Sequence, residues 1–357
     1  MSSHKKLFLV LAVLLASVPC LRGQVAANFT GVVTDTSGAS IAAATVKVTN
    51  VETGAVRSSV TDDAGRYQVL ALPVGEYEIR VSKSGFEEEV RSGLHLAVGQ
   101  EAAVDLTLHV GEVKQQVTVK EEAPIVNTTT GDISGLVGER QVKELPLNGR
   151  SFDLLMTLNP CVVNFTSQKT GGTGISNSTT ANNFAVSGNR PQQNIFLLNG
   201  VEYSGAGENN MQPGGTSGML LGVDAVREFN VERDSYSAEL GKHPGGQVII
   251  VTQSGSKQWH GSVYEFLRNN ALDAPNYFDQ GSAPPFQRNQ FGASAGGPVQ
   301  TDKTFVFANY EGFRQNLHQT SAAFVPDAAS RASAVASVQH LLSLWPTAPA
   351  GAPDFNG

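Results

Sequence analysis

The chain has 357 residues, of which 16% are charged and 40% hydrophobic, with 37 glycines and a formal net charge of -7. This length predicts two or three domains, and few charges with many turn-forming residues favour β-strands joined by loops. The negative net charge argues against a nucleic-acid partner, because binding phosphates needs a basic face. The two cysteines are too few for a disulfide framework.

The N-terminal segment has the features of an export signal. Lys5 and Lys6 give a positive start, and a mostly apolar run follows at residues 7–18. The run is shorter than the roughly 20 apolar residues that span a bilayer. We therefore expect a signal peptide at residues 1–23, with a buried N-terminal helix as the alternative. Its removal would leave Cys161 as a single cysteine, so no internal disulfide is expected.

The next region, residues 24–112, alternates between polar and apolar side chains over short runs such as residues 45–49 and 77–81. Period-two alternation between turn residues is typical of half-buried antiparallel strands. We expect about seven strands in a small β-sandwich. Tyr67 and Tyr77 are predicted to lie in its core and to anchor paired strands from one face.

Three motifs mark this region: Asp-Asp-Ala-Gly-Arg-Tyr at residues 62–67, Leu-Pro-Val-Gly-Glu-Tyr at 72–77 and Ser-Gly-Phe at 84–86. Together they resemble the carboxypeptidase regulatory-like domain. The resemblance implies a transthyretin/Ig-like β-sandwich that serves as an accessory module. Peptidase activity is not implied, because no His-Glu-x-x-His motif is present and His95 and His109 are isolated. Some relatives of this sandwich bind sugars, which leaves an alternative function, a secreted or cell-surface carbohydrate-binding or adhesion module.

Residues 113–255 form a second region in which strand, turn and helix signals mix. Residues 113–121 alternate as a short strand, and residues 137–145 favour one or two helical turns. A stretch rich in Gly, Ser, Thr and Asn at residues 166–183 is expected to be a loop. Residues 223–231 predict a short helix that runs into a strand, so we expect a mixed α+β domain.

Four motifs follow one another in this region: Asn-Gly-Val at residues 199–201, Val-Arg-Glu-Phe at 226–229, Tyr-Ser-Ala-Glu-Leu-Gly at 236–241, and Gly-Gly-Gln-Val-Ile-Ile-Val-Thr at 245–252. The Asn-Gly pair predicts a hairpin turn, and the paired glycines lead into a buried strand. This order resembles the plug domain of TonB-dependent outer-membrane receptors, and the third motif is typical of Oar-like members. The resemblance assigns five residues to the plug motif: Asn199, Gly200, Val201, Gly245 and Gly246.

Val117, Thr118 and Val119 occupy the place of this family's TonB box. A periplasmic energiser can bind such an extended segment by adding it as a strand, with little side-chain specificity. The resemblance therefore implies a TonB-type periplasmic energiser as partner of the full-length receptor. The alternative is that these residues form the last strand of the sandwich or a linker.

Residues 256–357 begin with alternating segments rich in aromatic residues. Strands are predicted at residues 259–268, 286–298 and 304–313, with a tight turn at 299–303. Their sequences closely resemble the opening of the Oar-like β-barrel, although a soluble sandwich edge has a similar composition.

The remainder, residues 322–357, is rich in Ala, Ser and Pro, with a helix predicted at residues 328–344 inside a long external loop. Three spanning strands are too few for a single-chain barrel, which closes with at least ~8, whereas a plug-bearing transporter has ~22. An open strand edge in lipid would leave backbone groups unpaired. We therefore expect a truncated chain, the N-terminal part of a longer receptor with an incomplete transmembrane β-barrel.

The combined expectation is a mainly β protein of the cell outer membrane, with the sandwich and plug on the periplasmic side and the plug gating ligand uptake. Its expected partners are the energiser, outer-membrane lipid and an external ligand, an oligosaccharide or a peptide, that the sequence does not identify. No Gly-x-Ser-x-Gly elbow, P-loop or paired His/Cys ligands are present. We expect no catalytic residues, no metal and no cofactor.

Overall fold

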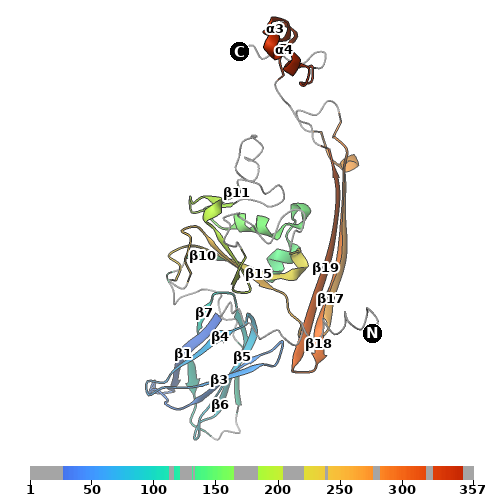
Figure 1. The fold of residues 1–357 in the computed structure, drawn as a ribbon. Helices are drawn as coiled ribbons and strands as arrows, with labels where there is room; N and C mark the ends of the chain where they lie inside the picture. The colour runs from blue at the N-terminus through green and yellow to red at the C-terminus, as the bar shows by residue number, and fades with distance from the viewer. Residues whose placement is uncertain are drawn as a thin grey trace, which may run out of the picture. The chain divides into compact units, whose positions relative to one another are not determined.

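The structure is a computed structural model that describes residues 27–111, 116–120, 131, 133–164, 184–203, 221–237, 240–275, 282–318 and 325–348. Strands predominate, with a few short helices between them (Figure 1), which confirms the expectation of a mainly β protein. The chain divides into two compact units, Met1–Tyr264 with Phe291–Phe313 and Glu265–Gln290 with Arg314–Gly357. The expected signal peptide and the expected loop at residues 166–183 lie outside the described residues.

Two sheets form the sandwich. One has the order β4-β1-β7, with β8 also pairing with β1, and the other has the order β3-β2-β5-β6-β9. The strands are β1 (Ala27–Asp35), β2 (Thr45–Asn50), β3 (Val56–Val60), β4 (Arg66–Leu72), β5 (Gly75–Ser82), β6 (Glu88–Leu96), β7 (Glu101–Ala103), β8 (Leu106–Leu108) and β9 (Gln116–Lys120). The sandwich has more strands than the roughly seven that the sequence predicted. One reason is that two short strands, β7 and β8, pair with successive halves of β1.

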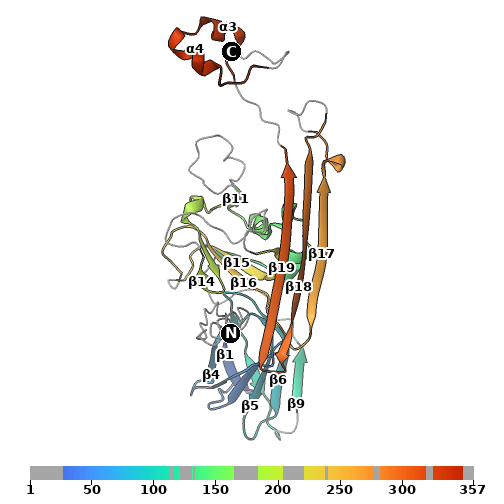
Figure 2. The same ribbon diagram turned by 45° about the vertical axis from the view of Figure 1, so that its right-hand side comes forward.

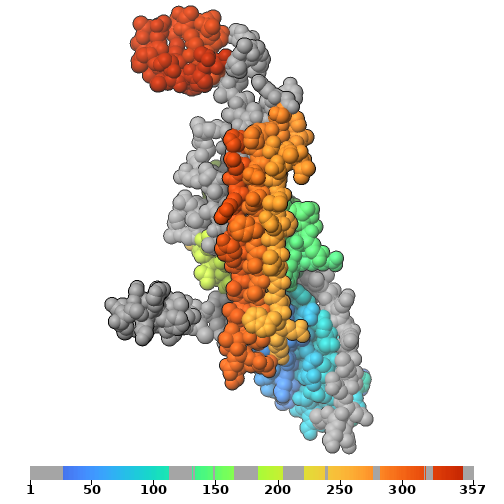
Figure 3. All heavy atoms as spheres, turned by 90° about the vertical axis from the view of Figure 1, so that its right-hand side faces the viewer, coloured from blue at the N-terminus to red at the C-terminus, as the bar shows by residue number. Residues whose placement is uncertain are grey.

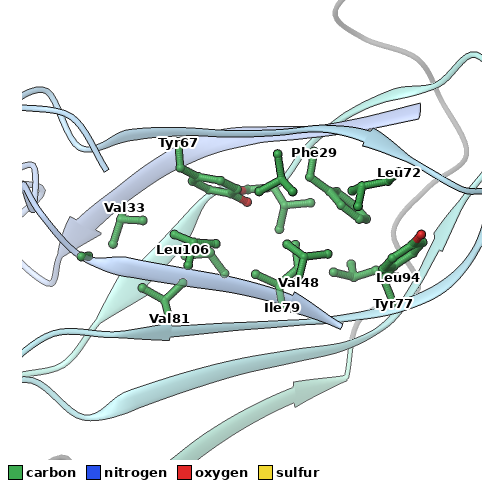
Figure 4. Close-up of a cluster of buried hydrophobic side chains, with 14 of the residues drawn as sticks. Phe29, Val33, Val48, Tyr67, Leu72, Tyr77, Ile79, Val81, Leu94 and Leu106 are labelled. Carbon is green, nitrogen blue, oxygen red and sulfur yellow. The ribbon is translucent and has the colours of Figure 1, made fainter. Parts of the chain in front are cut away.

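The core of the sandwich lies between these two sheets (Figure 4). Phe29 of β1 and Tyr77 of β5 meet edge to face, with ring centroids 5.6 Å apart. Val48 of β2 and Ile79 of β5 belong to the same cluster and are fully buried. Alternate residues of a strand point to one face, so the period-two pattern of the sequence becomes a continuous apolar layer.

Tyr67 and Tyr77 are core residues as expected, but the expectation that they anchor paired strands is wrong. β4 pairs with β1, whereas β5 pairs with β2 and β6. The connection at Pro73 and Val74 carries the chain from one sheet to the other, so the two rings enter the core from opposite sheets (Figure 4). The Tyr67 hydroxyl donates to the Val104 carbonyl at 2.7 Å, and the Tyr77 hydroxyl donates to the Pro73 carbonyl at 2.6 Å. Both tyrosines thus pack in the core and stabilise the sandwich.

The second region contains a five-stranded sheet of order β10-β15-β16-β13-β14 and a separate pair, β11-β12. Its strands are β10 (Ile133–Val137), β11 (Val162–Asn164), β12 (Phe184–Val186), β13 (Ile195–Leu198), β14 (Val201–Glu202), β15 (Val226–Asp234) and β16 (Gln247–Thr252). Its helical segments are α2 (Glu139–Glu144), η1 (Asn148–Arg150), η2 (Phe152–Leu158), η4 (Pro191–Gln193) and η5 (Val223–Ala225). The helix predicted at residues 137–145 and the helix-to-strand transition at residues 223–231 are both present.

The inner strand β15, next to β10 at one edge of the sheet, is buried along most of its length, and its two faces differ. Phe229 and Val231 are completely buried in an apolar cluster with Phe152 of η2. On the other face Glu228 and Glu232 are also buried, although they are acids. Buried charged groups need partners, so this second face is where specific polar contacts are expected.

The third region is a sheet of order β17-β18-β19, formed by β17 (His260–Asn269), β18 (Phe286–Gln300) and β19 (Thr304–Leu317). The three predicted strands are confirmed, and β18 is long enough to shorten the predicted turn to residues 301–303. The strands run side by side in Figure 2, and Figure 3 shows one face of the sheet as spheres. Val263 and Tyr310 are 87% and 65% exposed. Exposed apolar side chains at alternating positions fit a lipid-facing surface, with Glu265 as an exposed exception.

Two short helices, α3 (Ala328–Ser333) and α4 (Ala336–Leu342), replace the single helix predicted at residues 328–344. The backbone is extended at Ala334 and Val335, which separates the two helices. The Arg331 side chain donates to the carbonyl of Leu342 at 2.8 Å and so ties α3 to the end of α4. No helix in the described part of the chain is long and apolar enough to cross a membrane. A further short turn, η6 (Asn270–Leu272), follows β17.

Candidate functional site

The first half of the predicted plug motif forms one end of the parallel pair β13–β16. Asn199 and Gly200 have φ values of 50° and 81°, the left-handed conformation that a two-residue hairpin turn requires. The Asn199 Oδ1 accepts the Thr252 amide at 3.0 Å, and the Asn199 amide donates to the Ile250 carbonyl at 2.9 Å. Val201 begins β14 and is exposed. The turn therefore fastens β13 to the end of β16.

The second half of the motif holds the opposite end of the same pair. The Gly245 amide donates to the Gln193 carbonyl at 3.1 Å, and the Gly246 amide donates to Oδ1 of Asn194 at 2.9 Å. A Cβ atom at Gly246 would collide with the Val186 side chain, so only glycine fits there. The paired glycines thus allow close packing where the chain enters β16.

Val117, Thr118 and Val119 lie in β9, which pairs in parallel with β6 as the fifth strand of a sandwich sheet. The predicted domain bounds place this segment in the second region, residues 113–255. Its strand character follows the alternation of the sequence, whereas its neighbour could not be predicted from it. The pairing corresponds to the alternative that the sequence left open, a last sandwich strand.

A polar network, here called the latch, connects the second region to the β17-β18-β19 sheet within the first unit. It consists of Arg150, Asp224, Ser262, Tyr264 and Glu311. Arg150 forms an ion pair with Asp224, and both side chains are largely buried. The Ser262 hydroxyl of β17 donates to Asp224 at 2.8 Å. The carboxylate of Asp224 therefore joins η5 both to η1 and to β17.

The aromatic part of the latch lies beside this ion pair. The guanidinium carbon of Arg150 lies 4.2 Å from the centre of the Tyr264 ring, a cation–π geometry. The Tyr264 hydroxyl donates to the Glu311 carboxylate of β19 at 2.7 Å. Gly222 packs so closely on Glu311 that a Cβ atom there would overlap the carboxylate. Ser262 and Tyr264 of β17 and Glu311 of β19 thus face the second region.

A second set of contacts, here called the joint, connects β15 to the sandwich within the same unit. Arg227 donates to both carboxylate oxygens of Glu52, at 2.8 and 2.5 Å. The next residue, Glu228, accepts the Val98 amide at 2.7 Å. Burial raises the pKa of Glu228 to about 7, although the Val98 amide and the positive charge of Arg227 oppose this shift. The joint therefore holds a carboxyl group that titrates near neutral pH.

We expect Glu228→Gln to make the stability of the chain less dependent on pH. Because the folded-state pKa of Glu228 is raised, its protonated form contributes stability that is present below pH 4.5 and is lost as the pH rises through about 7. The glutamine carbonyl still accepts the Val98 amide, so the variant should be about 2 kcal/mol more stable at pH 8 and similar at pH 4. Arg227, Glu139 and Glu52 also act electrostatically on this carboxyl. Urea unfolding at both pH values measures the effect, and equal gains at both would contradict it.

The latch and the joint were not predicted from the sequence. Arg150 and Asp224 are separated by 74 residues, and Glu52 and Arg227 by 175. The available signal was the presence of single polar residues, such as Glu311, within strands that otherwise alternate small and aromatic side chains. In the described part of the chain, no group of three or more His, Cys, Asp or Glu side chains is arranged to hold a metal.

Comparisons with known proteins match different parts of the chain. A family described as a carboxypeptidase regulatory-like domain matches residues 28–109, and one described as an outer membrane beta barrel domain matches residues 251–354. The TonB-dependent transporter Oar of Myxococcus xanthus is 25% identical over 268 residues, covering 70% of this chain and 23% of the transporter. The chain thus spans about a quarter of the length of this curated relative.

Two solved structures show weaker similarity. The siderophore receptor PirA from Acinetobacter baumannii is 17% identical, with a TM-score of 0.36 over 50% of this chain and 24% of that chain. The Bacillus anthracis TIE protein is 17% identical, with a TM-score of 0.22 over 24% of this chain and 16% of that chain. Similarity at this level carries no functional conclusion.

The sequence matches support an outer-membrane location and do not support the alternative of a carbohydrate-binding module. The relative is a transporter, so they also add nothing in favour of an enzyme. The chain is similar to the TonB-dependent transporter Oar and matches a carboxypeptidase regulatory-like domain and, in part of its length, an outer membrane beta barrel domain.

Proposed function

We propose that this chain provides the accessory sandwich, the plug and the first barrel strands of a receptor that imports an external ligand across the outer membrane. In this proposal residues 24–112 form the sandwich, residues 113–255 the plug and residues 256–357 the start of the barrel. The sandwich and plug face the periplasm after export by the N-terminal signal. A TonB-type energiser drives uptake, and the ligand is an oligosaccharide or a peptide.

The latch is the observation that carries this proposal. A plug must be held inside its barrel by contacts that are specific yet breakable, because it has to move when the ligand passes. The latch has this character, since Asp224 and Arg150 contact Ser262 and Tyr264 through hydrogen bonds, charge and a ring face. An apolar interface of the same size would lack such directional contacts.

The assignment of Asn199, Gly200, Val201, Gly245 and Gly246 to the plug follows from the same proposal. These residues hold the two ends of the β13–β16 pair and contribute no chemistry of their own. Their role is to keep the plug sheet rigid, so that movement occurs at the latch and at the joint. A gate of this kind needs a rigid domain whose contacts with its surroundings can be broken and formed again.

Asp224→Ala in the complete receptor is expected to open a passive leak. The variant loses the ion pair with Arg150 and the hydrogen bond from Ser262. Hydrogen bonds to charged groups contribute about 1.5–3 kcal/mol, and each 1.4 kcal/mol changes an equilibrium tenfold, so the open population should rise roughly tenfold or more. Vancomycin, which is too large for general porins, serves as the probe in an outer membrane that contains the receptor. Its minimum inhibitory concentration should fall several-fold.

Arg140→Ala is the matched control for this experiment. Arg140 lies on α2 and also forms an ion pair, with Glu144 at 2.9 Å, but its side chain is 87% exposed and outside the latch. Exposed pairs contribute little, so this variant should keep the vancomycin resistance of the unmodified receptor. An unchanged resistance in Asp224→Ala, with the receptor present at normal level in the outer membrane, would contradict the gating role.

A further inference from the structure

The sandwich sheet ends in a strand that lies beyond the carboxypeptidase regulatory-like match. The carboxypeptidase regulatory-like match stops at residue 109, yet β9 adds residues 116–120 to the edge of the sheet (Figure 2). Glu88 pairs with Gln116 and Ser92 with Lys120, so the pairing covers the whole of β9. In the described sheet β9 has a neighbour on one side alone, β6.

The β6–β9 pairing has features of a contact that can be released. Parallel pairs are slightly less stable per residue than antiparallel ones, and β6 keeps its antiparallel partner β5 if β9 leaves. On β6, opposite Val117 and Val119, Glu89 and Arg91 form an ion pair of 3.0 Å. Glu89 is 4% exposed, and its Oε2 has no hydrogen-bond partner among the described residues.

We propose that the β6 edge of the sandwich is a dock for β9 and controls when a periplasmic energiser can bind this strand. This inference rests on the proposed function and takes Val117, Thr118 and Val119, the TonB-box candidate of the sequence, as the segment that the energiser binds. When β9 pairs with β6, the backbone hydrogen-bonding groups along one of its two edges have partners within the sandwich. A pull on β9 in that state is transmitted to the sandwich through β6. The energiser reaches the plug only after β9 leaves the dock, so the sandwich acts as a brake on coupling.

A reversible disulfide across the dock tests this. Ser92→Cys and Lys120→Cys place two cysteines at paired positions, where neighbouring strands about 5 Å apart suit a disulfide. Cys161→Ser removes the exposed native thiol. The control carries Lys47→Cys and Ser58→Cys, an exposed pair that joins β2 to β3 elsewhere in the same sheet. The probe is the purified periplasmic domain of the host's TonB-type energiser, whose affinity for the whole chain is measured with each pair oxidised and reduced.

The oxidised dock variant should bind the energiser at least tenfold more weakly than its reduced form, with no such change in the control pair. Hydrogen exchange adds a second measurement: bound energiser should remove protection from the β6 amides at residues 88–92 that face β9. Equal affinity of the oxidised and reduced dock variants, with the disulfide confirmed by mass, would overturn the dock.

A synthetic peptide of residues 112–124 separates this result from a failure of the proposed function. A peptide that binds the energiser shows that the coupling segment is correctly assigned, so the disulfide result then decides the dock alone. A peptide that does not bind, together with a reduced chain that does not bind, removes the coupling role of β9 and the dock with it. A peptide that binds at least tenfold more tightly than the unmodified chain supports the dock directly, because only the chain has β6.

Discussion

Phe229→Ala should lower the local stability of the β10-β15-β16-β13-β14 sheet by about 4 kcal/mol, within the range measured when a buried phenylalanine leaves a cavity. Phe229 is completely buried on β15, and its ring centroid lies 5.8 Å from that of Phe152. β15 pairs with β10 on one side and β16 on the other, so the cavity would form beneath an inner strand of the sheet. Native-state hydrogen exchange of the β15 and β16 amides in the whole chain measures the change.

Val201→Ala is the control for this substitution. Val201 belongs to the same sheet but is 62% exposed in the edge strand β14, so its truncation should change stability by no more than about 0.5 kcal/mol. The sandwich amides should keep their exchange rates in both variants, because their core is a separate cluster. A loss below about 1 kcal/mol in Phe229→Ala would mean that the ring is not packed as the structure shows.

The features that the sequence predicted well are local ones. The turn at Asn199 and Gly200 follows from two residue types that tolerate positive φ, and β16 follows from an apolar run entered through Gly245 and Gly246. Such signals depend only on residues that are close in the sequence, because the backbone conformation of a turn or a short strand is determined within a few residues. The motifs therefore predict the two ends of the β13–β16 pair, whereas the order of the strands in the sheet is not a local feature.

The features that escaped prediction are pairings between distant segments. Period-two alternation indicated that Tyr67 and Tyr77 are buried but not that they belong to opposite sheets, because alternation defines a face and not a neighbour. The same limit applies to β9, whose strand character was expected and whose pairing with β6 was not. A charged residue such as Arg227 carries no local signal at all of the acid that it will meet.

Arg227→Met should weaken the joint by about 3 kcal/mol, the lower end of the cost of removing one partner from a buried ion pair. The Arg227 side chain is 11% exposed, whereas that of Glu52 is 29% exposed, so water can partly compensate for the lost partner. The free energy of unfolding from urea titration gives the cost. Adding Glu52→Gln should recover at least about 1 kcal/mol, since the double variant no longer contains the unpaired acid.

The same substitution should also move the titration of Glu228. The positive charge of Arg227 lowers the pKa of this carboxyl, so its loss should raise the pKa above the value of about 7. The Val98 amide donates to Glu228, and its NMR shift against pH therefore reports the change. Arg140→Met, which removes an exposed charge from α2, should leave that midpoint in place. If the titration midpoint of Glu228 does not move in Arg227→Met, the charge of Arg227 does not act on this carboxyl. A shifted midpoint would mean that the two contacts of the joint respond to pH together.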